Sequence, residues 1–282
     1  MRALTFLASR FVAGDTAEDA VDAVAQLNSE GLKATLDFLG EDCESDAQAE
    51  AATLEYLSLL DAIHKAGLDC NVSLKLTQFG LNLDPEMAEF NLRRVLERAA
   101  ATENFVRIDM ESSTYTQVTI DLFKKVFADY KNVGIVIQAC LNRSEADIAE
   151  LNALGARVRL CKGAYKEPAS VAIQKKDLLN KNYDELAKSL LTNGTYPGIA
   201  THDEQRVQSV LSFAKEKNIS GDAFEFQMLY GLRPQRWSEL VADGWSMRVY
   251  VPYGTHWLPY FTRRLRERKE NVLFVLKSLV TG

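Results

Sequence analysis

The chain has 282 residues, 47% of them apolar and 26% charged, and 39 acidic against 33 basic side chains give a net charge of −6. This composition is typical of a globular protein and excludes collagen-like and disordered chains. No run of Lys and Arg provides the positive surface that a nucleic-acid partner requires. No segment has the roughly 18 apolar residues of a membrane span. The four cysteines form no CxxC pair and predict reduced residues. We therefore expect a cytoplasmic protein with no nucleic-acid partner, and a peripheral position at the inner membrane surface stays open.

Short apolar, β-branched runs alternate with longer amphipathic stretches to the end of the chain, which predicts an α/β fold. The expected strands are Lys33–Leu39, Asn71–Leu76, Phe105–Met110, Val133–Ala139, Arg157–Lys162, Gly198–His202, Ala223–Leu229 and Met247–Pro252.

The helices between them carry clear boundary signals. Asp84 and Pro85 predict an N-cap and a first helical residue. The preceding helix is expected to close at Gly67, and Gly194 is expected as a left-handed C-cap of a later one. Residues 1–31 form a separate helical extension in this interpretation, which we expect to cover the bottom of the following domain.

Eight strand–helix units without a linker favour a single (βα)8 barrel over residues 32–282, with an open doubly wound sheet as the main competitor. A final helix from about Thr255 to Leu279 is expected over the barrel mouth. No two glycines are two residues apart and no Gly-Lys pair occurs, which excludes the usual dinucleotide and P-loop motifs. The three histidines lack metal-site spacing, so no metal is expected.

Active sites of such barrels lie at the C-terminal ends of the strands. Every strand after the first places polar residues there: Lys75, Asp109 with Glu111, Gln138, Arg159 with Lys162, Thr201 with His202, Gln227 and Tyr250. A structural role remains an alternative for each one alone, such as charge neutralisation between Lys75 and Asp109. Two adjacent arginines, Arg263 and Arg264, precede Glu267 by four and three residues. They form either a solvated helix face with local salt bridges or a binding site for a carboxylate or pyrophosphate.

Several segments together resemble the proline dehydrogenase family. They are RLCKGAY (159–165), ATH (200–202), FQMLYG (226–231), YVPYG (250–254) and YFTRRL (260–265), with SLKL (73–76) and IDME (108–111) in the matching order. The resemblance covers nearly the whole chain and is closest to the monofunctional bacterial form.

The resemblance implies a distorted barrel that binds FAD and oxidises L-proline to Δ1-pyrroline-5-carboxylate by hydride transfer to flavin N5. Electrons pass to a membrane quinone, with a transient contact to pyrroline-5-carboxylate dehydrogenase as a further implied partner. It assigns Lys75, Arg263 and Arg264 to the proline carboxylate, with Asp109 organising them, and Tyr165, Leu229 and Tyr250 to the ring pocket. The implied FAD contacts are Gln138, Arg159, Lys162, Gly163, Ala164, Thr201, His202, Gln227, Arg264 and Glu267. Arg159 and Tyr250 are the implied catalytic residues.

A flavin performs the redox chemistry itself, so the lack of a nucleophile motif agrees with this interpretation. A different enzyme class also fits a barrel: an aldolase that forms a Schiff base on Lys75 or Lys162, if burial lowers the pKa of the lysine. A non-enzymatic barrel is the third alternative, although the polar strand ends would then be an unexplained cost.

Overall fold

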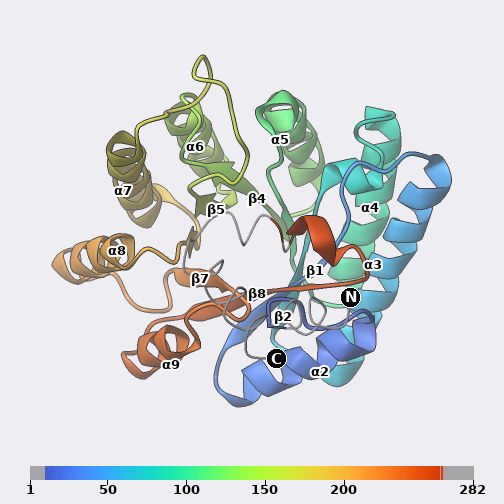
Figure 1. Ribbon diagram of the computed structural model, residues 1–282, viewed down its shortest axis with the longest axis horizontal. Coiled ribbons are helices and arrows are strands. Elements are labelled where there is room, and N and C mark those ends of the chain that lie inside the picture. The colour runs from blue at the N-terminus through green and yellow to red at the C-terminus, as the bar shows by residue number, and fades with distance from the viewer. Residues whose placement is uncertain (1–9, 261, 263–282) are drawn as a thin grey trace, which may run out of the picture.

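The protein is an eight-stranded closed parallel barrel surrounded by helices (Figure 1). The computed structural model describes residues 10–260 and residue 262. The strands are β1 (Lys33–Phe38), β2 (Cys70–Leu74), β3 (Val106–Ile108), β4 (Val133–Gln138), β5 (Arg157–Cys161), β6 (Gly198–Ala200), β7 (Glu225–Leu229) and β8 (Met247–Tyr253). Each strand pairs with the next in parallel, and β1 pairs with β8 to close the barrel. The predicted barrel is confirmed and the open sheet is excluded.

The helices alternate with the strands and form the outer layer. They are α2 (Ala17–Ser29), α3 (Asp46–Ala66), α4 (Pro85–Ala101), α5 (Ser113–Asp129), α6 (Ser144–Ala153), α7 (Lys176–Asn193), α8 (Glu204–Glu216) and α9 (Pro234–Ala242), with a short 3-10 turn, η1 (Leu76–Phe79), after β2. Their inner faces pack on the outward side chains of the strands in one continuous apolar core. Among the described residues, no helix combines the length and apolar character needed to cross a membrane.

The helix boundaries follow from local chemistry in most places. Asp84 caps α4, its carboxylate accepting the Glu86 N–H at 2.9 Å, and Pro85 is the first helical residue, as predicted. Gly67 ends α3 in the left-handed conformation at φ +64°, also as predicted. The prediction for Gly194 is wrong, since its φ is −87°. Glycine is required there because a Cβ would lie 2.5 Å from the Leu190 carbonyl oxygen.

The α2 helix packs beside β1 and β8 rather than across the end of the barrel (Figure 1). Its buried residues Ala20, Val24 and Leu27 belong to the main core. The expectation that the N-terminal extension covers the bottom of the barrel is therefore wrong. The physical reason is that the outer faces of β8 and β1 are apolar and need a covering helix, and α2 fills that position in the ring between α9 and α3.

Several strands end earlier than predicted, because the chain leaves the barrel to form the loops of the mouth. The second strand stops at Leu74 and the sixth at Ala200, so Lys75, Thr201 and His202 lie just beyond the ladder. The backbone is helical again from Trp257 to Tyr260, where the final helix was expected. The greater part of that expected helix lies outside the described residues.

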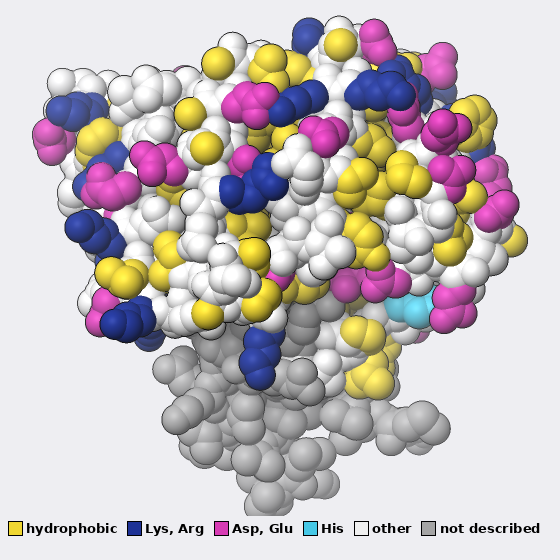
Figure 2. All heavy atoms as spheres, turned by 90° about the horizontal axis from the view of Figure 1, so that it is seen from above, with side chains coloured by type: hydrophobic (Ala, Val, Ile, Leu, Met, Phe, Trp, Pro, Cys, Tyr) yellow, Lys and Arg dark blue, Asp and Glu magenta, His cyan; other side chains and the backbone are white. Residues whose placement is uncertain are grey.

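The lower interior of the barrel is polar. Glu225 is 2% exposed and accepts a hydrogen bond from Arg248 Nε at 2.8 Å and another from Gln227 Nε2 at 2.6 Å. Arg107 is equally buried, and its guanidinium lies 4.9 Å from the centre of the Phe105 ring. These groups fill the floor of the barrel and leave its C-terminal end for the site. On the face in Figure 2 the described acidic and basic side chains are intermixed.

Candidate active site

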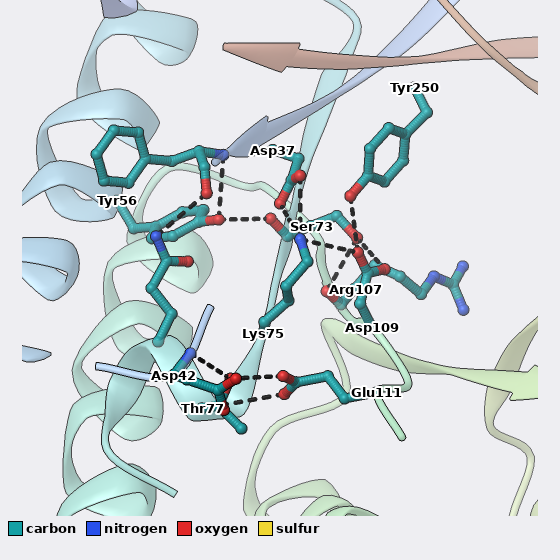
Figure 3. A network of polar contacts seen from close by, with 12 residues as sticks. Asp37, Asp42, Tyr56, Ser73, Lys75, Thr77, Arg107, Asp109, Glu111 and Tyr250 are labelled. Carbon is teal, nitrogen blue, oxygen red and sulfur yellow. Dashed lines mark hydrogen bonds and ion pairs between the residues drawn. The ribbon is translucent and has the colours of Figure 1, made fainter. Parts of the chain in front are cut away.

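Side chains from β1, β2, β3, β5 and β8, or from the residues directly after them, meet in one polar network at the C-terminal end of the barrel, and Figure 3 shows the part of it around Asp37, Lys75, Asp109 and Tyr250. Asp109 is at its centre. Its Oδ1 accepts hydrogen bonds from Arg159 Nη1 at 2.8 Å and from Ser73 Oγ at 2.6 Å. Its Oδ2 accepts the Tyr250 hydroxyl at 2.7 Å and lies 3.8 Å from Lys75 Nζ. Four of the residues predicted for the site are thus brought together.

Asp37, near the end of β1, belongs to this network although it was not among the predicted site residues. Its two carboxylate oxygens are 2.9 and 3.1 Å from Lys75 Nζ, so Asp37 is a closer partner of this lysine than Asp109. The expectation that only the strands after the first place polar residues at the barrel mouth is therefore wrong. The available signal was the alternation of Thr35 and Asp37 with the apolar Ala34, Leu36 and Phe38, which places both polar side chains on the inward face.

The electrostatics of the network depend on its burial. Burial raises the pKa of Asp37 to about 6. The positive charge of Lys75 lowers this pKa, and the negative charge of Asp109 raises it further. Burial alone would lower the pKa of Lys75, but the two neighbouring carboxylates together raise it above its usual value. Lys75 is therefore a permanent ammonium at neutral pH. This contradicts the aldolase alternative for Lys75, because a Schiff base requires a neutral amine.

Arg159, in the middle of β5, is the second cation of the network. It is 5% exposed, and its guanidinium carbon is 5.2 Å from the centre of the Tyr250 ring. Its Nη1 donates to Asp109, but its Nε and Nη2 have no hydrogen-bond partner among the described residues. Buried donors are rarely left unpaired in a native protein, so these two N–H groups indicate an acceptor from a bound molecule.

The neighbouring loops approach each other closely at Gly163. Its φ is +110°, and a Cβ there would lie 2.4 Å from Cys140 Sγ and 3.3 Å from Gln138 Oε1. Only glycine allows this contact without displacement of the chain. Gln138 is itself oriented by the Glu111 carbonyl, which accepts a hydrogen bond from Gln138 Nε2 at 2.8 Å. The implied cofactor residues Gln138 and Gly163 therefore lie side by side.

The remaining predicted residues lie at varied distances from this centre. Lys162 Nζ is paired with Asp203 at 2.8 Å and Asn180 at 2.6 Å. His202 Nε2 accepts the Leu229 N–H at 2.9 Å, which joins the ends of β6 and β7. Thr201 Oγ accepts the Asp203 N–H, Ala164 is exposed and Tyr165 is half-buried. Gln227 faces the barrel floor through its bond to Glu225. Arg263, Arg264 and Glu267 lie outside the described residues.

All four cysteines, which are among the described residues, are free thiols, as the sequence indicated. Burial raises the pKa of Cys70 and Cys161 to about 12 and that of Cys140 to about 11. None of these three thiols is a thiolate nucleophile at neutral pH.

The fold and the site define an α/β-barrel enzyme whose buried cations and carboxylates surround a binding position at the C-terminal mouth. The sequence model of the family described as "Proline dehydrogenase" matches residues 20–277. The chain therefore belongs to the proline dehydrogenase family and is an oxidoreductase, which confirms the resemblance seen in the sequence.

Individual relatives agree with this assignment. The chain is 43% identical over 273 residues to Proline dehydrogenase 1 of Bacillus subtilis subsp. natto, covering 97% of this chain and 90% of that protein. It is 39% identical over 281 residues to Proline dehydrogenase of Deinococcus radiodurans, covering 98% and 91% respectively.

Among solved structures, proline utilization A (PutA) from Bdellovibrio bacteriovorus inactivated by N-propargylglycine is similar, with a TM-score of 0.86 and 26% identity. The match covers 93% of this chain and 32% of that one. The chain thus spans about a third of that longer protein.

Proposed function

We propose that this protein oxidises L-proline to Δ1-pyrroline-5-carboxylate with FAD as its cofactor and passes the electrons to a membrane quinone, as the first step of proline catabolism. The observation that carries the proposal is the buried network of Lys75, Asp109, Arg159 and Tyr250, in which two Arg159 N–H groups have no partner among the described residues.

The residues present fit a flavin. The residues that would hold FAD are Gln138, Arg159, Lys162, Gly163, Ala164, Thr201 and His202, with Gln227 less directly placed because its amide is bonded to Glu225. When bound, FAD would supply the acceptor for the hydride, which carries the two electrons that leave the proline ring. Carbonyl and ring-nitrogen atoms of a flavin are hydrogen-bond acceptors, which the two unpaired N–H groups of buried Arg159 require.

The chain's own residues bind and orient the substrate. Lys75 is held as an ammonium by Asp37 and Asp109 and provides a fixed positive charge for the proline carboxylate. Arg263 and Arg264 would add further cations. Tyr165, Leu229 and Tyr250 would form the wall of the ring pocket. Of these, Leu229 packs on the apolar cluster that contains Phe11 and Tyr260, which gives that wall a rigid base.

The product is a substrate for a pyrroline-5-carboxylate dehydrogenase, which we propose as a transient partner. A quinone acceptor dissolved in the lipid requires contact with a membrane surface. We therefore propose a cytoplasmic protein that binds peripherally to the inner membrane.

The test is anaerobic mixing of the purified yellow protein with L-proline while the flavin absorbance is recorded. The proposal predicts bleaching of the flavin and formation of Δ1-pyrroline-5-carboxylate in equal amounts. D-Proline serves as the control ligand, because a chiral pocket fixed by Lys75 and Tyr250 places only one enantiomer correctly. A protein that carries flavin and is not bleached by L-proline would contradict the proposal.

A further inference from the structure

Glu111 joins three loops at the mouth of the barrel. It lies in the loop between β3 and α5 and is 4% exposed. Its carboxylate accepts hydrogen bonds from the Thr77 backbone N–H, at 3.1 Å, and from the Thr77 hydroxyl. Thr77 Oγ in turn accepts the Asp42 N–H from the loop after β1, at 3.0 Å (Figure 3). One carboxylate therefore holds together the chain segments that follow β1, β2 and β3.

These contacts extend to Lys75 on the proposed substrate side of the site and to Gln138 on the proposed cofactor side. Thr77 lies in the 3-10 turn that begins directly after Lys75, so a fixed Thr77 also fixes the backbone from which Lys75 extends. The backbone carbonyl of Glu111 accepts Gln138 Nε2, so the same residue orients a side chain on the cofactor side.

We propose that Glu111 is a positioning residue of this site, whose carboxylate fixes the turn that carries Lys75 and whose negative charge opposes the carboxylate of the substrate. The inference rests on the proposed function, since it assumes that an anionic ligand binds beside Lys75. Neither the sequence motifs nor the predicted site residues assign Glu111 this role.

The charged groups around Glu111 come from each neighbouring element. Lys75 lies on the β2 side, Glu41 and Asp42 in the loop after β1, and Tyr115 on α5. Burial raises the pKa of Glu111 to about 7, although the hydrogen bonds from Thr77 and the charge of Lys75 lower it. Glu111 therefore changes its charge within the neutral pH range.

The direction of the pH effect follows from the sign of that charge. Below about pH 7 Glu111 is protonated and neutral, and it does not repel an anion. Above that pH it carries a negative charge in a poorly solvated place, and an anionic ligand beside Lys75 binds more weakly. We expect the dissociation constant of such a ligand to rise about three- to tenfold between pH 6 and pH 8.5.

The experiment measures binding of tetrahydrofuran-2-carboxylate to the flavin-loaded protein by titration calorimetry across this range. This probe has the ring and carboxylate of proline without the amine, so its own charge stays constant. Glu111→Gln is expected to lose the rise centred near pH 7 and to keep only the smaller change centred near pH 6, which comes from the ionisation of Asp37 beside Lys75. Thr77→Val is expected to move the midpoint to higher pH, because it removes a hydroxyl hydrogen bond that lowers the pKa of Glu111 in the wild-type protein.

Two further variants serve as controls. Glu97→Gln makes the same charge change at an exposed position on α4 and should retain the wild-type pH dependence. His256 is ionisable and lines the same cavity of about 680 Å³ as Lys75, so His256→Gln is measured as well and should also retain it. Thermal unfolding with the flavin bound checks that each variant is folded.

A wild-type dissociation constant that does not change with pH would overturn the inference. So would a Glu111→Gln variant that keeps the wild-type dependence. If Glu111→Gln does not fold, the Thr77→Val variant decides the question. A midpoint at the wild-type pH in that variant would also overturn the inference. Failure of the proposed function is distinguishable, because the wild-type protein would then neither bind the probe nor be reduced by L-proline.

Discussion

Replacement of Asp37 by Asn is expected to stabilise the protein at neutral pH. Asp37 is 1% exposed, and two carboxylates, Asp37 and Asp109, flank the single ammonium of Lys75. Burial and the repulsion of Asp109 outweigh the attraction of Lys75 and raise the pKa of Asp37 from 3.8 to about 6. Lys75 would keep Asp109 as a counterion at 3.8 Å in the variant.

The magnitude follows from the two pKa values. A carboxyl group with a higher pKa in the folded chain binds its proton more tightly there, so folding loses stability as the pH rises from about 4 through about 6. A difference of about two pH units between the folded and unfolded pKa corresponds to roughly 3 kcal/mol at pH 7. Asparagine is uncharged at every pH, and its amide oxygen still accepts a hydrogen bond from Lys75. We expect Asp37→Asn to raise the free energy of unfolding by on the order of 2 to 3 kcal/mol at pH 7.

The assay is urea unfolding of the flavin-loaded protein, followed by circular dichroism at several pH values between 4 and 7. The gain should shrink as the pH falls and become small near pH 4, close to the pKa of 3.8 in the unfolded chain. Asp222→Asn, at an exposed position, should change the unfolding free energy by less than about 0.5 kcal/mol throughout. A loss of stability at pH 7 in Asp37→Asn would show that the ion pair is net stabilising and would refute the reasoning.

Three other substitutions test separate parts of the structure. Arg159→Met should slow flavin reduction by L-proline at least tenfold in stopped-flow measurements, while Arg157→Met, at the exposed opposite end of the same strand, should not. Tyr250→Ser should narrow the difference between the oxidation rates of L-proline and of ring-hydroxylated proline. An unchanged ratio of these rates would contradict the proposed place of Tyr250 in the pocket wall. Arg248→Met should lower the free energy of unfolding at pH 7 by about 3 to 5 kcal/mol, because it leaves the buried carboxylate of Glu225 without its ion-pair partner. That loss should become smaller in acid, since Arg248 holds the pKa of Glu225 below its usual value.

The barrel was predictable because its strands are short apolar runs at regular intervals, separated by helices with strong caps such as Asp84-Pro85 and Gly67. These signals are local, and each depends on only a few neighbouring residues. The position of α2 was not predictable from such signals. An amphipathic helix shows that it covers an apolar surface, but only the closure of β8 on β1 decides which surface that is.

The polar residues of the site were predictable individually, because the fold class alone directs side chains at the strand ends to the mouth. Their pairing was not. Lys75 was matched with Asp109, whereas its closer partner is Asp37, because Asp37 is opposite Ser73 in the register of β1 and β2. A shift of one residue would turn Asp37 to the outside. Register depends on packing over the whole barrel, which a single strand sequence does not contain.

The charges of the described network are balanced before any substrate binds. The positive charges of Lys75 and Arg159 equal the negative charges of Asp37 and Asp109 at pH 7. A substrate carboxylate would therefore add a negative charge that these four residues do not compensate, and a poorly solvated site makes such an excess costly. The proposed function thus requires further cations, and in that proposal Arg263 and Arg264, which are adjacent in the sequence and lie outside the described residues, would supply two. If Arg263, which is not among the implied FAD contacts, is replaced by Met, affinity for proline should fall steeply while the flavin stays bound, because the described network has no positive charge in excess.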